Sequence, residues 1–262
     1  RITPIFGPHA SYTLNKEQLA ATRAAALELG VPISIHVSES PFEVQNSLDT
    51  YGMTSIEMYE SINFFDAHTI AAHVVWPTET EIPILRDRKV GVIHNPTSNM
   101  KIASGIAPIT EMLAAGVLVG LGTDGAASNN DLDMWEEMRL AALLQKVDRM
   151  DPEALPATAV LSMATSGGAM AIGLGDEIGS LEAGKRADLI QVAFEDVHHI
   201  PTYDVISHLV YVNDEQDVAS VVVDGKVLMR ERQILTIDTD RVRKEATELA
   251  ARIQSALEQR NQ

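Results

Sequence analysis

The chain has 262 residues, 45% of them hydrophobic, and a formal net charge of −17, which fits an acidic globular protein with room for one large domain and an appendage. This charge argues against nucleic acid or an anionic membrane surface as partner, because both bind clustered Lys and Arg. No stretch is apolar for long enough to span a bilayer. The absence of cysteine excludes disulfides and thiolate metal sites, and it fits a reducing, cytoplasmic compartment.

Short apolar segments alternate with helical patterns along the first half of the chain. Predicted strands are Ile2–Phe6, Pro32–His36, Thr69–His73, Val90–His94 and Val117–Gly122. Predicted helices are Lys16–Leu29, Thr54–Ile62, Thr78–Asp87, Ile109–Ala115, Asp131–Lys146 and Pro156–Ala171. The polar stretch Ser38–Gly52 is predicted to be a long loop able to fold over a site as a lid. The alternation of strand and helix predicts a parallel α/β fold.

Each predicted strand is followed by a residue that can do chemistry. His36, His73 and His94 end their strands, Asp124 follows the fifth strand, and His9 follows the first. The carboxyl ends of parallel strands meet at one edge of a sheet, where such folds place their active sites. We therefore expect these side chains to share a site, although a structural role for His94 is equally compatible with the pattern.

The pattern changes near Gly175, where turn-rich sequence and short strands replace the long alternation. Val218–Val223 and Lys226–Met229, joined by Asp224-Gly225, are predicted to form a hairpin. A charged amphipathic pattern predicts a surface helix at Thr239–Gln259. The predicted domains are therefore residues 1–176, 177–238 and 239–262: a barrel-like domain, a small β unit and a C-terminal helix.

Several polar motifs follow the predicted strands and carry a family resemblance. They are Gly7-Pro-His-Ala-Ser-Tyr-Thr13, His36-Val-Ser-Glu39, His94-Asn-Pro-Thr-Ser-Asn-Met-Lys101, Thr123-Asp-Gly-Ala-Ala-Ser128 and Ile178-Gly-Ser-Leu-Glu-Ala-Gly-Lys-Arg-Ala-Asp188. With these motifs the sequence resembles the amidohydrolase superfamily, and within it the adenosine-type deaminases that act on S-adenosylhomocysteine and 5′-methylthioadenosine. The resemblance implies a metal-bearing (β/α)8 barrel, as in TIM-like folds, with a β-sandwich appendage.

The implied barrel is incomplete in this sequence. A full barrel needs about 250 residues for eight strand–helix units, whereas about five units precede Gly175. The family also places a His-x-His pair of metal ligands on its first strand, and no His-x-His occurs here. We therefore expect a partial barrel, part of a β-sandwich, and an N-terminal portion with further ligands outside this sequence.

The resemblance implies a role for each candidate residue in a mononuclear metal site. His36 and Asp124 would be metal ligands, with zinc the expected ion and iron an alternative. Asp124 would also take a proton from water, His73 would orient that water, and a protonated Glu39 would donate to the purine N1. His9 and Ser128, with Glu39, would contact the substrate.

These roles predict a hydrolytic deaminase that converts a 6-amino purine nucleoside to its 6-oxo product and ammonia. A triazine or guanine aminohydrolase, or a chlorohydrolase, is an alternative on the same scaffold, and an acid at Glu39 favours deamination because chloride needs no proton to leave. A third possibility is an inactive fragment that acts as a binding module, which the missing His-x-His favours. The expected partner is a small-molecule nucleoside, and a homo-oligomer is a family-level expectation.

Overall fold

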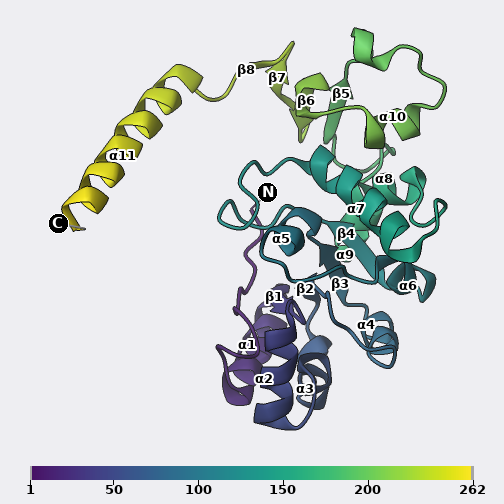
Figure 1. Ribbon diagram of the computed structural model, residues 1–262, viewed down its shortest axis with the longest axis vertical. Coiled ribbons are helices and arrows are strands. Elements are labelled where there is room, and N and C mark those ends of the chain that lie inside the picture. Colours follow the sequence, from purple (N-terminus) through teal and green to yellow (C-terminus); the bar gives the residue numbers. More distant parts are fainter. Residues whose placement is uncertain (1, 261–262) are drawn as a thin grey trace. The chain divides into compact units, whose positions relative to one another are not determined.

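The computed structural model describes residues 2–260, which form two compact units (Figure 1). Of these residues, unit 1 comprises 2–185 and Val197–Glu215, and unit 2 comprises Arg186–Asp196 and 216–260. Among the described residues, no helix combines the length and the apolar character needed to cross a membrane. The domain boundaries predicted at residues 176 and 238 stay predictions.

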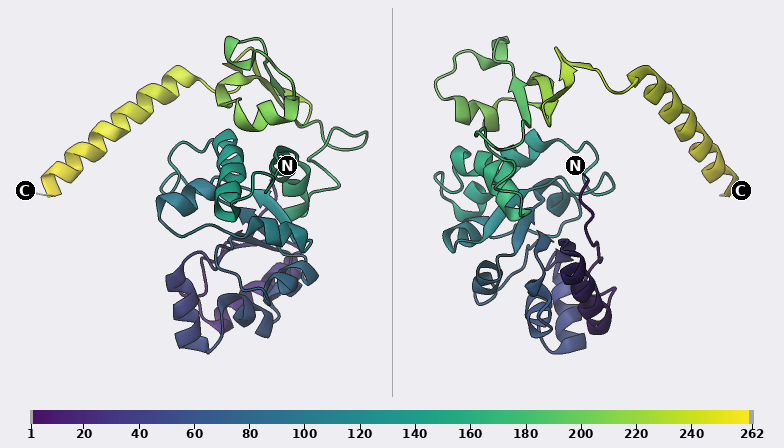
Figure 2. Two further views of the ribbon diagram at one scale, coloured as in Figure 1. Left: turned by 45° about the vertical axis from the view of Figure 1, so that its right-hand side comes forward. Right: turned by 180° about the vertical axis from the view of Figure 1, so that it is seen from behind.

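Unit 1 is built on a parallel sheet with the strand order β1-β2-β3-β4 (strands labelled in Figure 1; two further views in Figure 2). Its strands are β1 (Ile33–Val37), β2 (Thr69–His73), β3 (Gly91–His94) and β4 (Leu118–Leu121). In register, Val37 lies beside His73 and His94 beside Leu121, so the strands finish at a common edge. The predicted α/β class with a parallel sheet is confirmed.

The strand predicted at Ile2–Phe6 is wrong. Within this segment only Phe6 pairs with the sheet, through a single parallel bridge to Ile33. Residues 2–5 are exposed, and Pro4 has no N–H to donate to a ladder. The predicted first strand is therefore reduced to one bridge beside β1.

Helices surround the sheet of unit 1, and some of them connect its successive strands (Figures 1 and 2). They are α1 (Lys16–Leu29), α2 (Pro41–Tyr51), α3 (Ser55–Ser61), α4 (Ile82–Asp87), α5 (Pro96–Lys101), α6 (Ile109–Ala114), α7 (Met134–Arg149), α8 (Ala157–Ala164), α9 (Ser166–Ala171) and α10 (Val205–Tyr211). Short 3₁₀ turns occur at Phe64–Asp66, Val197–His199 and Glu215–Asp217. The helix predicted at Lys16–Leu29 is confirmed, with Asn15 in a capping box and Gly30 as its left-handed C-cap.

The predicted lid loop at Ser38–Gly52 is instead mostly helix α2. Ser40 caps its N-terminus by accepting the Glu43 amide, Pro41 occupies the first turn, and Gly52 ends it at φ +70°. These are standard start and stop signals for a helix. The prediction gave more weight to the polar composition of the segment than to these helix signals, and the predicted lid loop is wrong.

The long helix predicted at Pro156–Ala171 is broken at Thr165 into α8 and α9. The break lets α9 pack closely on β3 and β4. A Cβ on Gly91 of β3 would lie 1.8 Å from the Ala171 carbonyl oxygen, and a Cβ on Gly120 of β4 would lie 2.9 Å from the Gly168 Cα. Glycine at these positions therefore permits backbone-to-backbone contact between sheet and helix.

The core of unit 1 lies between this sheet and its helices. Its largest fully buried apolar side chains are Leu19, Ile33, Ile35, Ile56, Met58, Tyr59, Phe64, Leu85, Ile109, Met112 and Met163. These side chains come from both the strands and the helices of unit 1. Because a closely packed core holds its strands rigidly, the strand ends have fixed positions.

Unit 2 contains an antiparallel sheet of order β5-β6-β7-β8. Its strands are β5 (Leu189–Val192), β6 (Val218–Val223), β7 (Lys226–Arg230) and β8 (Gln233–Ile234). The hairpin predicted between β6 and β7 is confirmed, and its turn residues Asp224 and Gly225 have φ values of 55° and 73°. Two positive φ values are the signature of a type I′ turn.

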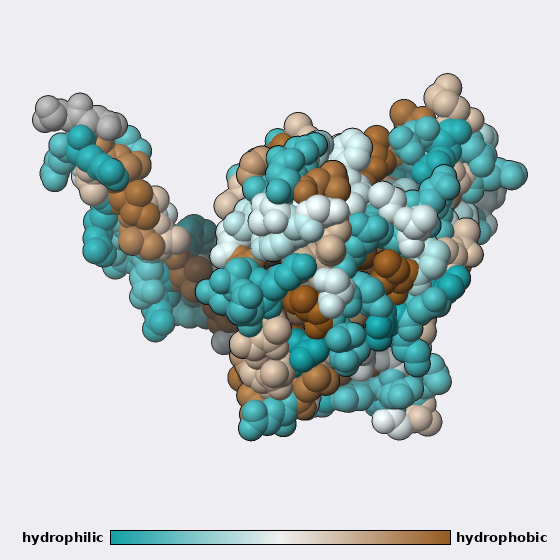
Figure 3. Space-filling model, turned by 90° about the horizontal axis from the view of Figure 1, so that it is seen from below, coloured by the Kyte–Doolittle hydropathy of each residue, from teal (hydrophilic) through white to brown (hydrophobic). Residues whose placement is uncertain are grey.

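The C-terminal helix α11 (Thr239–Arg260) confirms the predicted amphipathic helix. None of its described residues is buried. Val242, Leu249, Ile253 and Leu257 recur at helical spacing, and Figure 3 shows an apolar stripe along a mostly hydrophilic helix.

Candidate metal centre and active site

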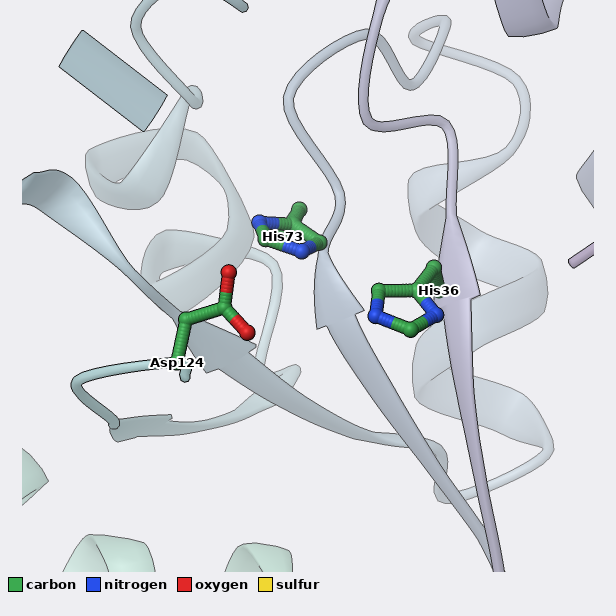
Figure 4. A group of neighbouring side chains, drawn as sticks. All are labelled: His36, His73 and Asp124. Carbon is green, nitrogen blue, oxygen red and sulfur yellow. The ribbon is translucent and has the colours of Figure 1, made fainter. Parts of the chain in front are cut away.

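Three side chains from separate strand ends converge in unit 1 (Figure 4). His36 lies in β1, His73 ends β2, and Asp124 follows β4. Each offers one ligand atom, and these atoms all lie within 4.8 Å of one another. The structure therefore brings together three of the residues that the sequence singled out.

The backbone at these strand ends adopts an uncommon conformation. His73 has φ +73°, Asp124 has φ +60°, and Ser38, just after β1, has φ +47°. Non-glycine residues in this left-handed region cost free energy, and they persist where surrounding structure holds them. At His73 and Asp124 this sharp turn directs the side chain toward the space that the two residues share with His36.

His36 is oriented by a hydrogen bond to the backbone. Its Nδ1 lies 2.7 Å from the carbonyl oxygen of His9, and since a carbonyl only accepts, Nδ1 carries the proton. Nε2 is thus left with a lone pair for a ligand, the arrangement common for metal-binding imidazoles. The same contact ties the exposed His9 to the site, with its ring centroid 4.9 Å from that of His36.

His73 is fully buried and is oriented by an amide. Its Nδ1 lies 2.8 Å from Oδ1 of Asn99, which can only accept, so Nδ1 donates. Its Nε2 has no hydrogen-bond partner among the described residues and lies 3.6 Å from Oε1 of Glu39. A buried nitrogen left in this way is suited to hold water or a ligand.

Asp124 accepts hydrogen bonds from two serine hydroxyls through the same oxygen. Oδ2 lies 2.6 Å from Oγ of Ser128 and 2.8 Å from Oγ of Ser98. Burial alone would raise the pKa of Asp124, but the hydrogen bonds from Ser128, Ser98 and the Gly125 amide lower it. The carboxylate is therefore ionised at neutral pH and can act as a ligand or as a base.

The chemistry of this group fits a divalent cation. His36 offers a neutral imidazole and Asp124 an ionised carboxylate, which are ligands that suit zinc, and His73 places a second imidazole nitrogen beside them that can orient water. The unpartnered Nε2 of buried His73 and the oriented Nε2 of His36 both face the space beside Asp124 (Figure 4). The residues present thus fit the metal that the sequence predicted.

Sequence reasoning missed the residues that support these groups. Asn99 had no signal beyond its position in the polar run after His94, and it reaches His73 across 26 positions of sequence. Two buried carboxylates were also missed: Glu43 accepts the amides of Ser38 and Glu39, and Glu137 accepts the Thr97 amide and the Asn129 side chain. A charged residue in a helix gives no sign of burial until the fold is known.

His94 is buried and lies near His73. Neither ring nitrogen has a hydrogen-bond partner among the described residues. Burial, and to a smaller extent the neighbouring His73, lowers the pKa of His94 to about 3. His94 is therefore neutral at ordinary pH.

Comparison with known proteins shows the family to which this chain belongs. The profile of the amidohydrolase family matches residues 1–228. This chain belongs to the amidohydrolase family. Over 253 residues the chain is 51% identical to the 5-methylthioadenosine/S-adenosylhomocysteine deaminase of Desulforudis audaxviator, a match that covers 97% of this chain and 59% of that protein. The resemblance noted in the sequence is confirmed.

Two solved structures of this amidohydrolase fold are closely similar. An adenosine deaminase from Xanthomonas campestris with bound zinc gives a TM-score of 0.93 at 38% identity, over 96% of this chain and 57% of that chain. Atrazine chlorohydrolase TrzN from Arthrobacter aurescens TC1 complexed with zinc gives a TM-score of 0.87 at 32% identity, over 93% of this chain and 54% of that chain. The chain therefore spans less than two thirds of the length of the proteins it matches.

Proposed function

We propose that this chain carries the catalytic strand ends of a metal-dependent hydrolytic deaminase for adenosine-type nucleosides. The observation that carries the proposal is the convergence of His36, His73 and Asp124, with Glu39 3.6 Å from Nε2 of His73. The similarity to a 5-methylthioadenosine/S-adenosylhomocysteine deaminase supports this substrate class. The reaction is addition of water at C6 of the purine and loss of ammonia.

His36 and Asp124 would hold the metal, and zinc is proposed because both solved neighbours contain it. When bound, such an ion supplies Lewis acidity that makes water nucleophilic near neutral pH. We also propose that unit 1 is part of a (β/α)8 barrel and the antiparallel sheet part of a small β-sandwich, in keeping with the fold similarity.

The side chains of this chain divide the proton transfers. Ionised Asp124 accepts a proton from the attacking water, and His73 orients that water through Nε2 because Nδ1 is committed to Asn99. Glu39 donates its proton to the ring N1 as water adds to C6. It then takes the proton of the C6 hydroxyl and passes it to the amino group, so that C6=O forms as the C–N bond breaks and ammonia leaves; the proton held by Asp124 restores the acid form of Glu39. Positioned transfers of this kind contribute about 10²–10⁴-fold to rate.

His9 and Ser128 are proposed as substrate contacts. The exposed ring of His9 lies beside His36, so it is accessible to a molecule that enters the site. The hydroxyl of Ser128 is hydrogen bonded to Asp124, so it can hold both the carboxylate and a substrate group.

A chlorohydrolase is the second candidate, because the fold is also similar to that of atrazine chlorohydrolase TrzN. Release of chloride requires no proton on the leaving group, whereas release of ammonia does. The position of Glu39 beside His73 therefore favours deamination.

The decisive experiment is a substrate panel on the zinc-loaded full-length protein that contains these residues. Ammonia and chloride release would be measured with S-adenosylhomocysteine, 5′-methylthioadenosine, adenosine, guanine and atrazine. We expect ammonia and a 6-oxo purine from the adenosine-type compounds. Chloride from atrazine, or ammonia from guanine alone, would support the alternatives, and absence of both turnover and metal would indicate a non-catalytic module.

A further inference from the structure

Glu43 is the buried carboxylate closest in sequence to the proposed acid Glu39. Its side chain comes from the first turn of α2, directly after the turn that carries Glu39. It is fully buried, with 0% of its surface exposed. A charged residue is seldom buried to this extent unless its oxygens are satisfied.

The two oxygens of Glu43 accept from two successive backbone amides. Oε1 lies 2.9 Å from the amide nitrogen of Ser38, and Oε2 lies 2.8 Å from that of Glu39. The hydroxyl of Ser11 donates to Oε1 at 3.4 Å. One carboxylate thus fixes both peptide groups that precede the Glu39 side chain.

The rest of this turn is held from the neighbouring strand end. The Ser38 carbonyl accepts the amides of Val75 and Trp76, each at 3.0 Å, and the Ser38 hydroxyl lies 3.0 Å from that of Ser55. With φ +47°, Ser38 needs such restraint to keep its conformation. Among the described groups, Glu43 alone is hydrogen bonded to the amides on both sides of this bend.

We propose that Glu43 is a positioning residue that sets the orientation of Glu39 toward His73 and the substrate. The inference rests on the proposed function for the role of Glu39, but the hydrogen bonds that carry it do not. Glu43 itself is buried beneath the turn and does not touch the reacting atoms. Its effect on turnover is therefore exerted through Glu39.

Glu43→Gln is the sharpest variant, because an amide has one acceptor oxygen and presents N–H groups where the second oxygen was. One of the two amides at Ser38 and Glu39 then faces a donor, and the turn must change. A matched control is Glu81→Gln. Glu81 is 1% exposed and accepts the Thr78 amide and the Thr54 hydroxyl, contacts that do not involve Glu39.

Hydrogen–deuterium exchange on the full-length protein tests the structural step. In Glu43→Gln, the amides of Ser38 and Glu39 should exchange faster while those of Ile33–Val37 keep their protection, and Glu81→Gln should leave both unchanged. Unchanged exchange at Ser38 and Glu39, or loss of protection across the whole strand, would overturn the proposal. Hydrogen–deuterium exchange tests the role of Glu43 in the turn even if the protein turns over no nucleoside. In that case only the proposed function fails.

Kinetics test the step through Glu39. Glu43→Gln should lower kcat about 10–100-fold with KM and zinc content near those of the parent protein, and the double variant with Glu39→Gln should be no slower than Glu39→Gln alone. Independent, multiplicative losses, or an effect confined to KM or zinc content, would contradict a role through Glu39. If Glu43→Gln does not fold, Glu43→Asp, which keeps the charge but shortens the side chain, is subject to the same two criteria.

Discussion

The two sheets of this protein use similar apolar residues in different ways. The strands of the parallel sheet β1–β4 are mostly buried, and their carboxyl ends lie at one edge. The strands of the antiparallel sheet β5–β8 are largely half-buried or exposed, and two of their connections are tight turns. Parallel strands return to the same edge after each crossover, so polar residues placed after them gather there.

The comparison explains where the candidate chemistry lies. In the parallel sheet His36, His73 and Asp124 lie at the ends of three different strands, and their ligand atoms still lie within 4.8 Å of one another. In an antiparallel sheet, consecutive strands end at opposite edges, so residues after successive strands are separated. Strand direction, more than composition, therefore brings residues that are distant in the sequence into one site.

The largest effect is expected from a carboxylate at the end of a parallel strand. Glu39→Gln removes the proposed proton donor and should lower turnover about 10²–10⁴-fold with zinc content unchanged. Glu195→Gln is the matched control, because Glu195 follows β5 of the antiparallel sheet and is exposed. Equal losses of zinc and activity in Glu39→Gln would contradict its assigned role, as would a comparable loss of turnover in Glu195→Gln.

Core truncation should separate the stabilities of the two sheets. Ile35 of β1 is 1% exposed and Ile190 of β5 is 48% exposed. Ile35→Ala should therefore cost about 2–5 kcal/mol of unfolding free energy, whereas Ile190→Ala should cost less than about 1 kcal/mol. Urea unfolding followed by circular dichroism measures the change in unfolding free energy for both variants, and equal costs would contradict the comparison.

Glycine substitution makes a similar contrast with a different cause. A Cβ at Gly91 would lie 1.8 Å from the Ala171 carbonyl oxygen, whereas a Cβ at Gly225 meets nothing within 4 Å. Gly91→Ala should cost about 3 kcal/mol through over-packing, and Gly225→Ala about 1 kcal/mol through its φ of +73° alone. Thermal unfolding of the two variants checks this order, and a larger loss in Gly225→Ala would reverse the interpretation.

Acid should weaken the parallel unit through His94. The pKa of His94 falls from 6.5 to about 3 on burial, so below pH 6.5 the unfolded chain binds a proton that the folded chain does not. The contribution of neutral His94 to the free energy of unfolding is therefore fully present above pH 6.5, and it is lost as the pH falls from 6.5 toward about 3. Relative to His94→Leu, the metal-free protein should lose about 2 kcal/mol between pH 7 and pH 5. Parallel pH profiles for the two proteins would contradict this.

Much of the fold and the core of the site were predictable from local pattern. Apolar runs that end in His36 and His73 indicated buried parallel strands, and the Asp124 motif indicated a third strand end. Pro4 and the exposed residues around it are why the predicted Ile2–Phe6 strand failed. The signals for α2 were present at Ser40 and Gly52 but were outweighed by its polar sequence.

The supporting residues could not be predicted in the same way. Asn99 contacts His73 only because α5 follows β3 beside β2, and Glu43 is buried only because its turn folds over it. The contact between Asn99 and His73 and the burial of Glu43 depend on tertiary geometry, which no spacing in the sequence encodes. The charge of Glu43 and its place on a helix resemble those of many exposed residues.

The most direct test of the account is to locate zinc by anomalous X-ray diffraction at its absorption edge, using crystals of the zinc-loaded full-length protein. The account predicts a peak about 2.0–2.2 Å from Nε2 of His36 and from a carboxylate oxygen of Asp124, and its loss in His36→Ala. A fully occupied zinc elsewhere, with this strand edge empty, would contradict it.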